Sequence, residues 1–214
     1  MNAVTSNRIL FVIDQFAGPY AGTEGQLLKL IFSLPEDQFQ PELLVLRSSE
    51  FIETGNMPCK THVLGVSKLF SIFTWISMWR FARNERKRGT ALCHVFFNDS
   101  SIVCPPVFSM FGIPVLISRR DMGYWYTRAY LRVLRITARF VAGVVTNSEA
   151  VKQVTAEKEG YPEDRISVIY NGYPAPEQEQ LSLQERFSVL AAIGLPQEGR
   201  FAVLVANLRE IKRI

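Results

Sequence analysis

The sequence has few of the residues that crosslink small domains or hold metals. Its 214 residues include three cysteines and two histidines. Cys59, Cys93 and Cys104 are scattered, odd in number and form no Cys-x-x-Cys pair. They indicate reduced thiols, buried as small apolar residues in a cytosolic protein. With so few histidines as well, we expect no metal site.

Long apolar runs are also missing. No stretch reaches the roughly 18 uninterrupted apolar residues of a membrane-spanning helix. The longest candidate, Ile102 to Ile117, contains Pro105, Pro106 and Pro114 and cannot be one helix. The first apolar run stops at Asp14, which disfavours a signal peptide. These absences predict a cytoplasmic protein.

A strong charge of one sign is lacking too. The 24 Lys and Arg residues exceed the 20 Asp and Glu residues by a formal net charge of +4. So small an excess fits a phosphorylated substrate or an anionic membrane, and fits equally well no particular partner. The basic residues are not interleaved with aromatic residues on strands, so we expect no nucleic acid partner.

What the sequence has is an alternation of short apolar runs and helix-length segments. The predicted strands are Arg8 to Ile13, Glu42 to Leu46, Thr61 to Leu64, Ala91 to Phe97, Val115 to Ser118, Gly143 to Thr146 and Arg165 to Tyr170. The predicted helices are Gln26 to Leu34, Leu69 to Arg88, Ser101 to Phe111, Trp125 to Val141 and Ser148 to Glu159. Alternation of this kind predicts an α/β fold, a doubly wound, mainly parallel Rossmann-like sheet with helices on both faces.

The pattern changes after residue 172, which ends a complete domain, 1–172. Residues 173–199 are polar and read as a linker with a connecting helix, Leu183 to Ile193. Residues 200–214 hold a new apolar run, Phe201 to Ala206. A lone strand cannot form a domain, so we expect it to begin a truncated second domain. The alternative is that it joins the first sheet at an edge.

Ligands of open α/β sheets lie at the carboxyl ends of the strands. After the first strand come Gly22, Thr23 and Glu24, where a helix begins and its free N–H groups suit phosphate. The loop is neither a dinucleotide fingerprint nor a P-loop. A purely structural interpretation, a loop with capping residues, stays open.

Two further loops carry candidate chemistry. After the fourth strand, His94 precedes Asn98 and Asp99, and this imidazole suits proton donation or a hydroxyl or phosphate ligand. After the fifth strand, Ser118 to Tyr124 includes an arginine pair followed by Asp121, and arginines suit phosphate oxygens. The alternatives are a half-buried histidine bonded to backbone, and an Asp121 that only neutralises the arginines.

Near the end of the chain, Arg209 and Lys212 follow the last apolar run and would suit a diphosphate clamp. Their structural alternative is a basic surface turn.

Together, in order and spacing, these motifs resemble glycosyltransferase family 4, from about Arg8 to Lys212. The motifs are Ala21 to Glu24, His94, Thr146 to Val151, Val168 to Gly172 and Val205 to Lys212. The segment from Ser118 to Trp125 resembles one bacterial branch of that family.

The resemblance implies two facing Rossmann-like domains with the active site between them. It implies transfer of a hexose from a nucleotide-sugar donor to a glycan or lipid-linked acceptor, with retention and without a metal or other cofactor. The family's lysine matches Lys212, whereas its arginine position holds Asn207, with Arg209 two residues on. Its usual His-x-His is His94-Val-Phe96, so one histidine is kept.

The expected catalytic residues are therefore His94 and Asp121. The expected donor or phosphate ligands are Gly22, Thr23, Glu24, Arg209 and Lys212, and the expected acceptor ligands are Asn98, Asp99, Arg119 and Arg120. The family's paired glutamates would lie beyond Ile214, so we expect this chain alone to have little or no transferase activity. The alternative function is a non-catalytic binding module, a truncated or degenerate paralogue.

The segment Lys68 to Arg88 combines apolar and aromatic residues with a basic end. Such a helix can dock on anionic lipid, and the family often uses lipid-linked acceptors. This predicts a peripheral protein on the inner face of the membrane. The alternative is a crossover helix packed on the sheet with its basic end in solvent.

Overall fold

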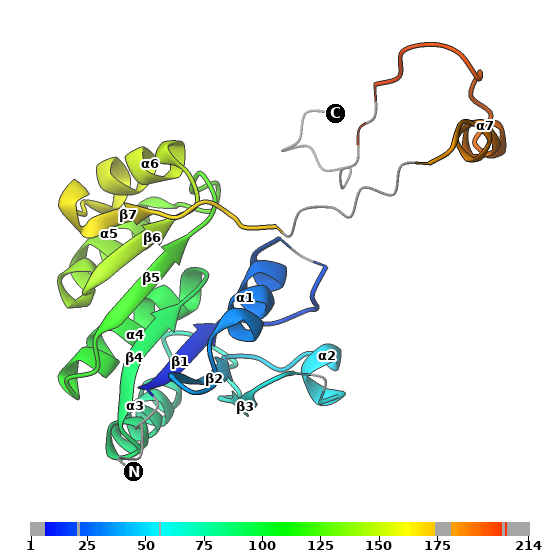
Figure 1. The fold of residues 1–214 in the computed structure, drawn as a ribbon. Helices are drawn as coiled ribbons and strands as arrows, with labels where there is room; N and C mark the ends of the chain where they lie inside the picture. Colours follow the sequence, from blue (N-terminus) through cyan, green and yellow to red (C-terminus); the bar gives the residue numbers. More distant parts are fainter. Residues whose placement is uncertain (1–6, 21, 56, 174–180, 203, 205–214) are drawn as a thin grey trace. The chain divides into compact units, whose positions relative to one another are not determined.

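The computed structural model describes residues 7–20, 22–55, 57–173, 181–202 and 204. The chain divides into two compact units, Met1–Gly172 and Tyr173–Ile214. The first unit holds the sheet and its helices (Figure 1). In the described residues, no helix is both long enough and apolar enough to cross a membrane.

Seven strands in the described residues form one sheet, and every neighbouring pair is parallel. They are β1 (Asn7–Ile13), β2 (Phe39–Val45), β3 (Lys60–Val63), β4 (Thr90–Val95), β5 (Val115–Arg119), β6 (Gly143–Thr146) and β7 (Ile166–Val168). Their order is β3-β2-β1-β4-β5-β6-β7. The chain thus reverses direction across the sheet between β1 and β4, where open α/β sheets form a crevice at the carboxyl ends of the strands.

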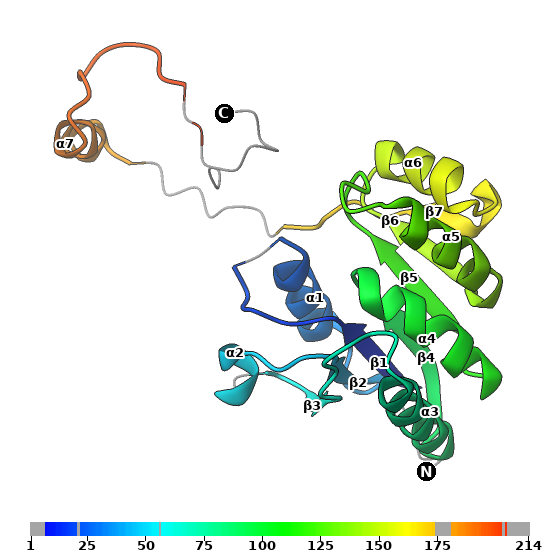
Figure 2. The ribbon, with the colours of Figure 1, turned by 180° about the vertical axis from the view of Figure 1, so that it is seen from behind.

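Helices cover both faces of this sheet (Figures 1 and 2). They are α1 (Gly22–Ser33), α2 (Glu50–Glu53), α3 (Ile72–Lys87), α4 (Asn98–Met110), α5 (Arg128–Thr137) and α6 (Glu149–Glu159), with 3-10 turns η1 (Ala138–Phe140) and η2 (Glu163–Arg165). One core lies under α1, around Phe11, Leu27 and Phe96, and the other lies under α3 to α6, around Met78 and Ile117. The predicted doubly wound α/β fold is confirmed.

Several predicted helix boundaries differ from the structure, among them the starts of α4 and α5. Helix α4 begins at Asn98 rather than Ser101, because a distant carboxylate caps it, and it continues through Pro105 and Pro106. Helix α5 begins at Arg128 rather than Trp125. The Thr127 hydroxyl caps it by accepting a hydrogen bond from the Tyr130 N–H at 3.2 Å.

The second unit contains helix α7 (Leu183–Ala192) in its described part. The Ser182 hydroxyl accepts a bond from the Glu185 N–H, and the Glu185 carboxylate accepts one from the Ser182 N–H, a reciprocal capping box. Phe201, Ala202 and Leu204 are in no strand, so the prediction of a strand is wrong for them. A strand needs a neighbour for its N–H and C=O groups, and the described part of this unit offers none. The other residues of that strand, with Arg209 and Lys212, lie outside the described residues.

Candidate active site at the carboxyl edge of the sheet

Asp14 occupies the crevice between β1 and β4. Its carboxylate accepts hydrogen bonds from three backbone N–H groups at the start of α4, those of Asn98 at 3.1 Å, Asp99 at 3.0 Å and Ser100 at 2.7 Å. Burial raises the pKa of Asp14, while these bonds oppose the shift. The Asp14 carboxylate therefore already occupies the anion-binding position at the amino end of α4. An anionic group of a ligand would have to bind elsewhere. Sequence reasoning did not single out Asp14.

Phe97 makes the turn from β4 into α4 in a strained conformation. Its φ of 66° with ψ of −166° lies in a region that favours glycine and is unusual for a bulky side chain. The Phe97 carbonyl accepts bonds from the Ser101 hydroxyl and, at 3.5 Å, from Arg119 Nη1. This turn directs the start of α4 onto Asp14.

A small pocket opens beside this turn. It is lined by residues from α1, the β4–α4 turn, β5 and the loop after it, namely Thr23, Phe97, Asn98, Ser118, Arg119, Arg120, Asp121 and Trp125. Five of these are predicted site residues that the fold brings together from three loops. Its volume of about 20 Å³ holds little more than one water molecule, so a sugar would lie against the pocket rather than inside it.

His94 lies behind the pocket. Its Nε2 is 2.9 Å from the Ser118 hydroxyl, and its ring packs against Phe11 and Phe96 at centroid distances of 5.6 and 4.6 Å. Burial, helped by the charge of Arg120, lowers the pKa of His94 to about 3. The imidazole is therefore neutral at physiological pH and reaches the pocket through Ser118.

The two predicted acceptor arginines have different environments. Arg119 is buried and paired with Glu159 through Nε to Oε1 at 2.6 Å and Nη2 to Oε2 at 2.8 Å. Its Nη1 donates to Ser101 at 2.8 Å, and the Tyr126 hydroxyl donates to Glu159. Because these contacts hold the Arg119 guanidinium in the core, they do not support its predicted contact with an acceptor.

Arg120 lies at the pocket, partly exposed, and its Nη2 donates to the Asn171 side-chain oxygen. The Asn147 side-chain nitrogen donates to the Arg120 carbonyl at 3.2 Å. In the described residues, the buried Oδ1 of Asn147 has no hydrogen-bond partner. Asn147 is thus a polar group at the carboxyl edge, within the motif Thr146 to Val151, that the sequence did not single out as a site residue.

The carboxylates of Asp121 and Asp99 both accept hydrogen bonds from other groups of the protein. The Asp121 carboxylate is exposed and accepts bonds from the Gly123 N–H at 2.6 Å and the Trp125 indole at 3.1 Å. A Cβ atom added at Gly123 would lie 2.1 Å from the Tyr126 ring and would collide with it. Asp99 accepts bonds from Arg47 Nη2 at 2.5 Å and the Tyr130 hydroxyl at 3.0 Å. Of the predicted polar residues after β4, Asn98 alone lines the pocket in the described structure.

The start of α1 supplies the other wall. Thr23 is partly exposed and lines the pocket, whereas Glu24 is buried and burial raises its pKa. Open space surrounds Gly22, but a Cβ on Gly25 would lie 2.6 Å from the Pro19 carbonyl oxygen. Close packing therefore requires glycine at Gly25, which sequence reasoning did not single out.

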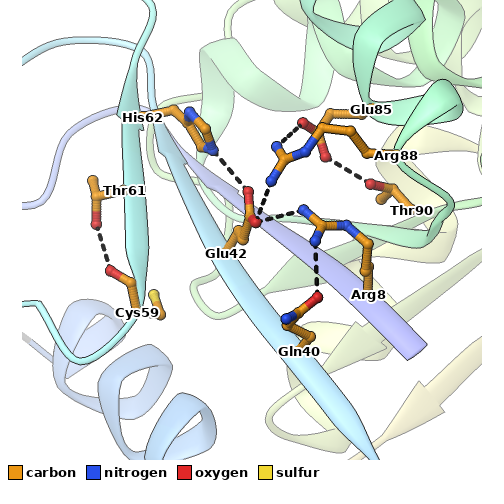
Figure 3. A network of polar contacts seen from close by, with 9 residues as sticks. All are labelled: Arg8, Gln40, Glu42, Cys59, Thr61, His62, Glu85, Arg88 and Thr90. Atoms are coloured by element: carbon orange, nitrogen blue, oxygen red, sulfur yellow. Dashed lines mark hydrogen bonds and ion pairs between the residues drawn. The ribbon is translucent and has the colours of Figure 1, made fainter. Parts of the chain in front are cut away.

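A second polar cluster lies toward the amino ends of the strands (Figure 3). Glu42 on β2 binds Arg8, Arg88 at 2.5 Å and His62 Nε2 at 2.7 Å. Glu42, His62 and Glu85 offer ligand atoms within 4.8 Å of one another, a spacing that could hold a metal ion. However, Arg88 also binds Glu85, at 2.5 Å, so guanidinium groups already neutralise both carboxylates. We assign this cluster a structural role.

Comparison with known proteins gives one family. The profile of Glycosyltransferase Family 4 matches residues 20–175. No curated protein sequence matches the chain.

Solved structures share the fold at low sequence identity. HepE of Anabaena, in complex with UDP and glucose, superposes with a TM-score of 0.64 at 17% identity, over 88% of this chain and 50% of that one. The lipopolysaccharide outer core galactosyltransferase WaaB superposes with a TM-score of 0.58 at 12% identity, over 81% of this chain and 50% of that one. UDP-GlcNAc 2-epimerase of Methanocaldococcus jannaschii superposes with a TM-score of 0.55 at 13% identity, over 77% of this chain and 45% of that one. The chain spans about half the length of these proteins.

Proposed function

Because the chain belongs to glycosyltransferase family 4, we propose that it forms the acceptor-side half of an enzyme that transfers a hexose from a nucleotide-sugar to a glycan or lipid-linked acceptor. We further propose that transfer retains the anomeric configuration and needs no metal or other cofactor. The observation that carries the proposal is the convergence of Thr23, Asn98 and Arg120 at one pocket on the carboxyl edge. The solved structures of HepE contain UDP and a UDP-sugar in a protein of this fold.

In this proposal the start of α1, with Gly22, Thr23 and Glu24, faces the donor phosphates, since backbone N–H groups at a helix start favour anions. The start of α4 is excluded from that task because Asp14 occupies it. Arg209 and Lys212 remain proposed ligands of the donor phosphates.

Arg120 and Asn98 are the proposed acceptor ligands, because both line the pocket. We assign Asp99 and Arg119 to supporting roles, since each is held by internal partners.

His94 and Asp121 remain the proposed catalytic residues. A neutral His94 cannot serve as a charged acid at pH 7, but through Ser118 it can orient a hydroxyl group toward the pocket. Asp121 is an exposed carboxylate held by a backbone N–H and an indole, a position suited to stabilising positive charge that develops on a sugar ring.

A titration monitored by amide NMR tests the site on the chain as it exists. With UDP-glucose or UDP as probe, the amide signals of Thr23 and Asn98 should shift, and Arg120→Gln should weaken binding of a phosphorylated or acidic glycan. Arg128→Gln, which removes an exposed arginine on α5, is the matched control and should bind like the parent. Shifts confined to other parts of the sheet would refute the proposed site.

The chain alone should turn over donor far more slowly than a version continued by a second Rossmann-like domain, because a closed cleft is needed to stabilise the leaving diphosphate. Comparable rates would refute this. A non-catalytic binding module is the second candidate, favoured by the internal bonds of Asp99 and Arg119. Ligand binding without donor turnover by the continued version would select it.

We also propose that the protein is cytoplasmic and associates peripherally with an anionic membrane through α3. Exposed apolar side chains on this helix, among them Phe73 and Ile76, and its basic end support this association.

A further inference from the structure

Helix α3 presents two opposite faces. Thr74, Met78, Ala82 and Glu85 are buried against the domain. At 100° per residue, the direction opposite to this set is occupied by residues spaced three and four apart. These outward residues are Phe73, Ile76, Arg80, Arg83 and Lys87.

The outward face changes character halfway along the helix. Its first half is apolar, with Ile72 69%, Phe73 76% and Ile76 42% exposed, and Phe70 just before the helix is 67% exposed. Its second half is cationic.

The cationic half forms a pocket of its own. Arg80, Arg83, Asn84 and Lys87 line it together with Trp79, around a volume of about 170 Å³. The Arg83 guanidinium lies 5.8 Å from the centre of the Trp79 ring. A cation beside an exposed tryptophan is an arrangement suited to the headgroup level of a lipid bilayer.

The direction in which α3 runs places the apolar end of its outward face at the same edge of the sheet as the candidate site. After β3, the N–H of Leu64 bonds to the Val45 carbonyl at 2.9 Å and that of Val66 to the Leu46 carbonyl at 2.8 Å, so the chain leaves β3 at the carboxyl edge. The helix then runs back to the start of β4. Its apolar end therefore belongs to the carboxyl edge, which also carries the candidate active site.

We propose that α3 docks obliquely on an anionic lipid surface, with Phe70, Phe73 and Ile76 inserted below the headgroups and Arg80, Arg83 and Lys87 on lipid phosphates. The oblique insertion turns the carboxyl edge of the sheet toward the membrane, where a lipid-linked acceptor would present its sugar. This orientation rests on the proposed membrane association but not on glycosyl transfer.

Charge favours a lipid surface over a second copy of the chain. A self-complementary contact through this face would bring two sets of cations into one interface, whereas anionic headgroups neutralise them. The cations lie on the same face as the apolar side chains, as in helices that bind in the plane of a membrane interface.

Vesicle sedimentation tests the docking. The chain should pellet with vesicles of phosphatidylcholine and phosphatidylglycerol, and much less with phosphatidylcholine alone. Phe73→Ser should weaken binding at least about tenfold, because a buried phenyl ring is lost from the interface. Phe32→Ser is the matched control, since Phe32 is 68% exposed on α1, and it should bind like the parent.

The cationic half is tested with matched double variants. Arg80→Gln with Arg83→Gln should weaken binding about 30-fold, at about fivefold for each cation near an anionic surface. Arg128→Gln with Arg132→Gln removes the same charge from exposed positions on α5 and should have a much smaller effect. Equal losses from both pairs would mean adsorption by net charge and would overturn the α3 site. Unchanged circular dichroism melting checks that each variant folds.

Depth measurements test the oblique orientation. An environment-sensitive fluorophore is attached at Phe73→Cys or Asn84→Cys in a Cys59→Ser background. Position 73 should be quenched by acyl-chain spin labels and position 84 by headgroup spin labels. Equal depths would overturn the oblique orientation while leaving membrane association intact. No lipid-dependent pelleting would overturn both, and neither result bears on donor turnover.

Discussion

Arg119 on β5 and Glu159 at the end of α6 form a bidentate ion pair in the core, with both side chains almost fully buried. The pair joins the strand that leads into the candidate site to the last turn of α6. Tyr126, in the loop that follows β5, donates a further hydrogen bond to Glu159. The loop that carries Arg120 and Asp121 is thus anchored by a buried charge pair a few residues away.

Glu159→Ala should therefore destabilise the domain strongly. It leaves the Arg119 charge buried without a partner, and breaking one side of a buried pair costs about 3–5 kcal/mol. Urea unfolding measures the loss. Glu157→Ala changes an exposed glutamate on the same helix and should stay within about 0.5 kcal/mol of the parent. Similar losses in both variants would contradict the assigned role of the pair.

Glu42 should make stability depend on pH in acid. Burial opposes its ionisation, but bonds from His62, Arg88 and Arg8 lower its pKa from 4.5 to about 2. The unfolded chain binds this proton first as pH falls, so the stabilisation is complete above pH 4.5 and is lost between 4.5 and 2. The shift corresponds to about 3 kcal/mol.

Glu42→Gln should remove that part of the pH dependence, as measured by unfolding between pH 2 and 6. Glu36→Gln, at an exposed position, is the control and should keep the parent's slope. An unchanged slope in Glu42→Gln would show that the ion cluster does not act on stability.

His94 should stay neutral in the folded protein far below the usual range of histidine. Its pKa of about 3 is set first by burial and then by the charge of Arg120. The unfolded chain binds the proton near pH 6.5, so His94 costs stability as pH falls from 6.5 toward 3. NMR of the imidazole carbons measures the titration directly.

Arg120→Gln should raise the pKa of His94, because it removes the nearby positive charge, yet leave it below 6.5 because burial remains. Titration of His94 near 6.5 in the parent protein would contradict the buried position of the ring.

Gly25→Ala and Gly22→Ala form a matched pair on α1. The first places a Cβ 2.6 Å from the Pro19 carbonyl and should cost about 1–3 kcal/mol through a backbone shift. The second meets open space and should change stability by less than about 0.5 kcal/mol. Chemical unfolding of the two variants compares them, and equal effects would show that the loop before α1 is not closely packed.

The sequence by itself determined the fold class, because apolar runs and helical spacing are local properties. The strands around Phe11, Leu44 and Ile117 are continuous apolar runs since both of their faces are covered, and the caps at Ser148 and Ser182 act within three residues. It also placed Thr23, Asn98 and Arg120 after strands, which in a parallel sheet brings them to one edge.

Only the tertiary structure decided which of these polar groups are available to a ligand. Arg119 and Arg120 are adjacent and both line the pocket, yet Arg119 is buried and paired with Glu159, 40 residues away, whereas Arg120 is partly exposed. Helix α4 begins where Asp14, 84 residues earlier, caps it. Such partners are chosen by how helices pack across the sheet, and the resulting burial, rather than residue type, decides whether a charge supports the core or remains at the surface.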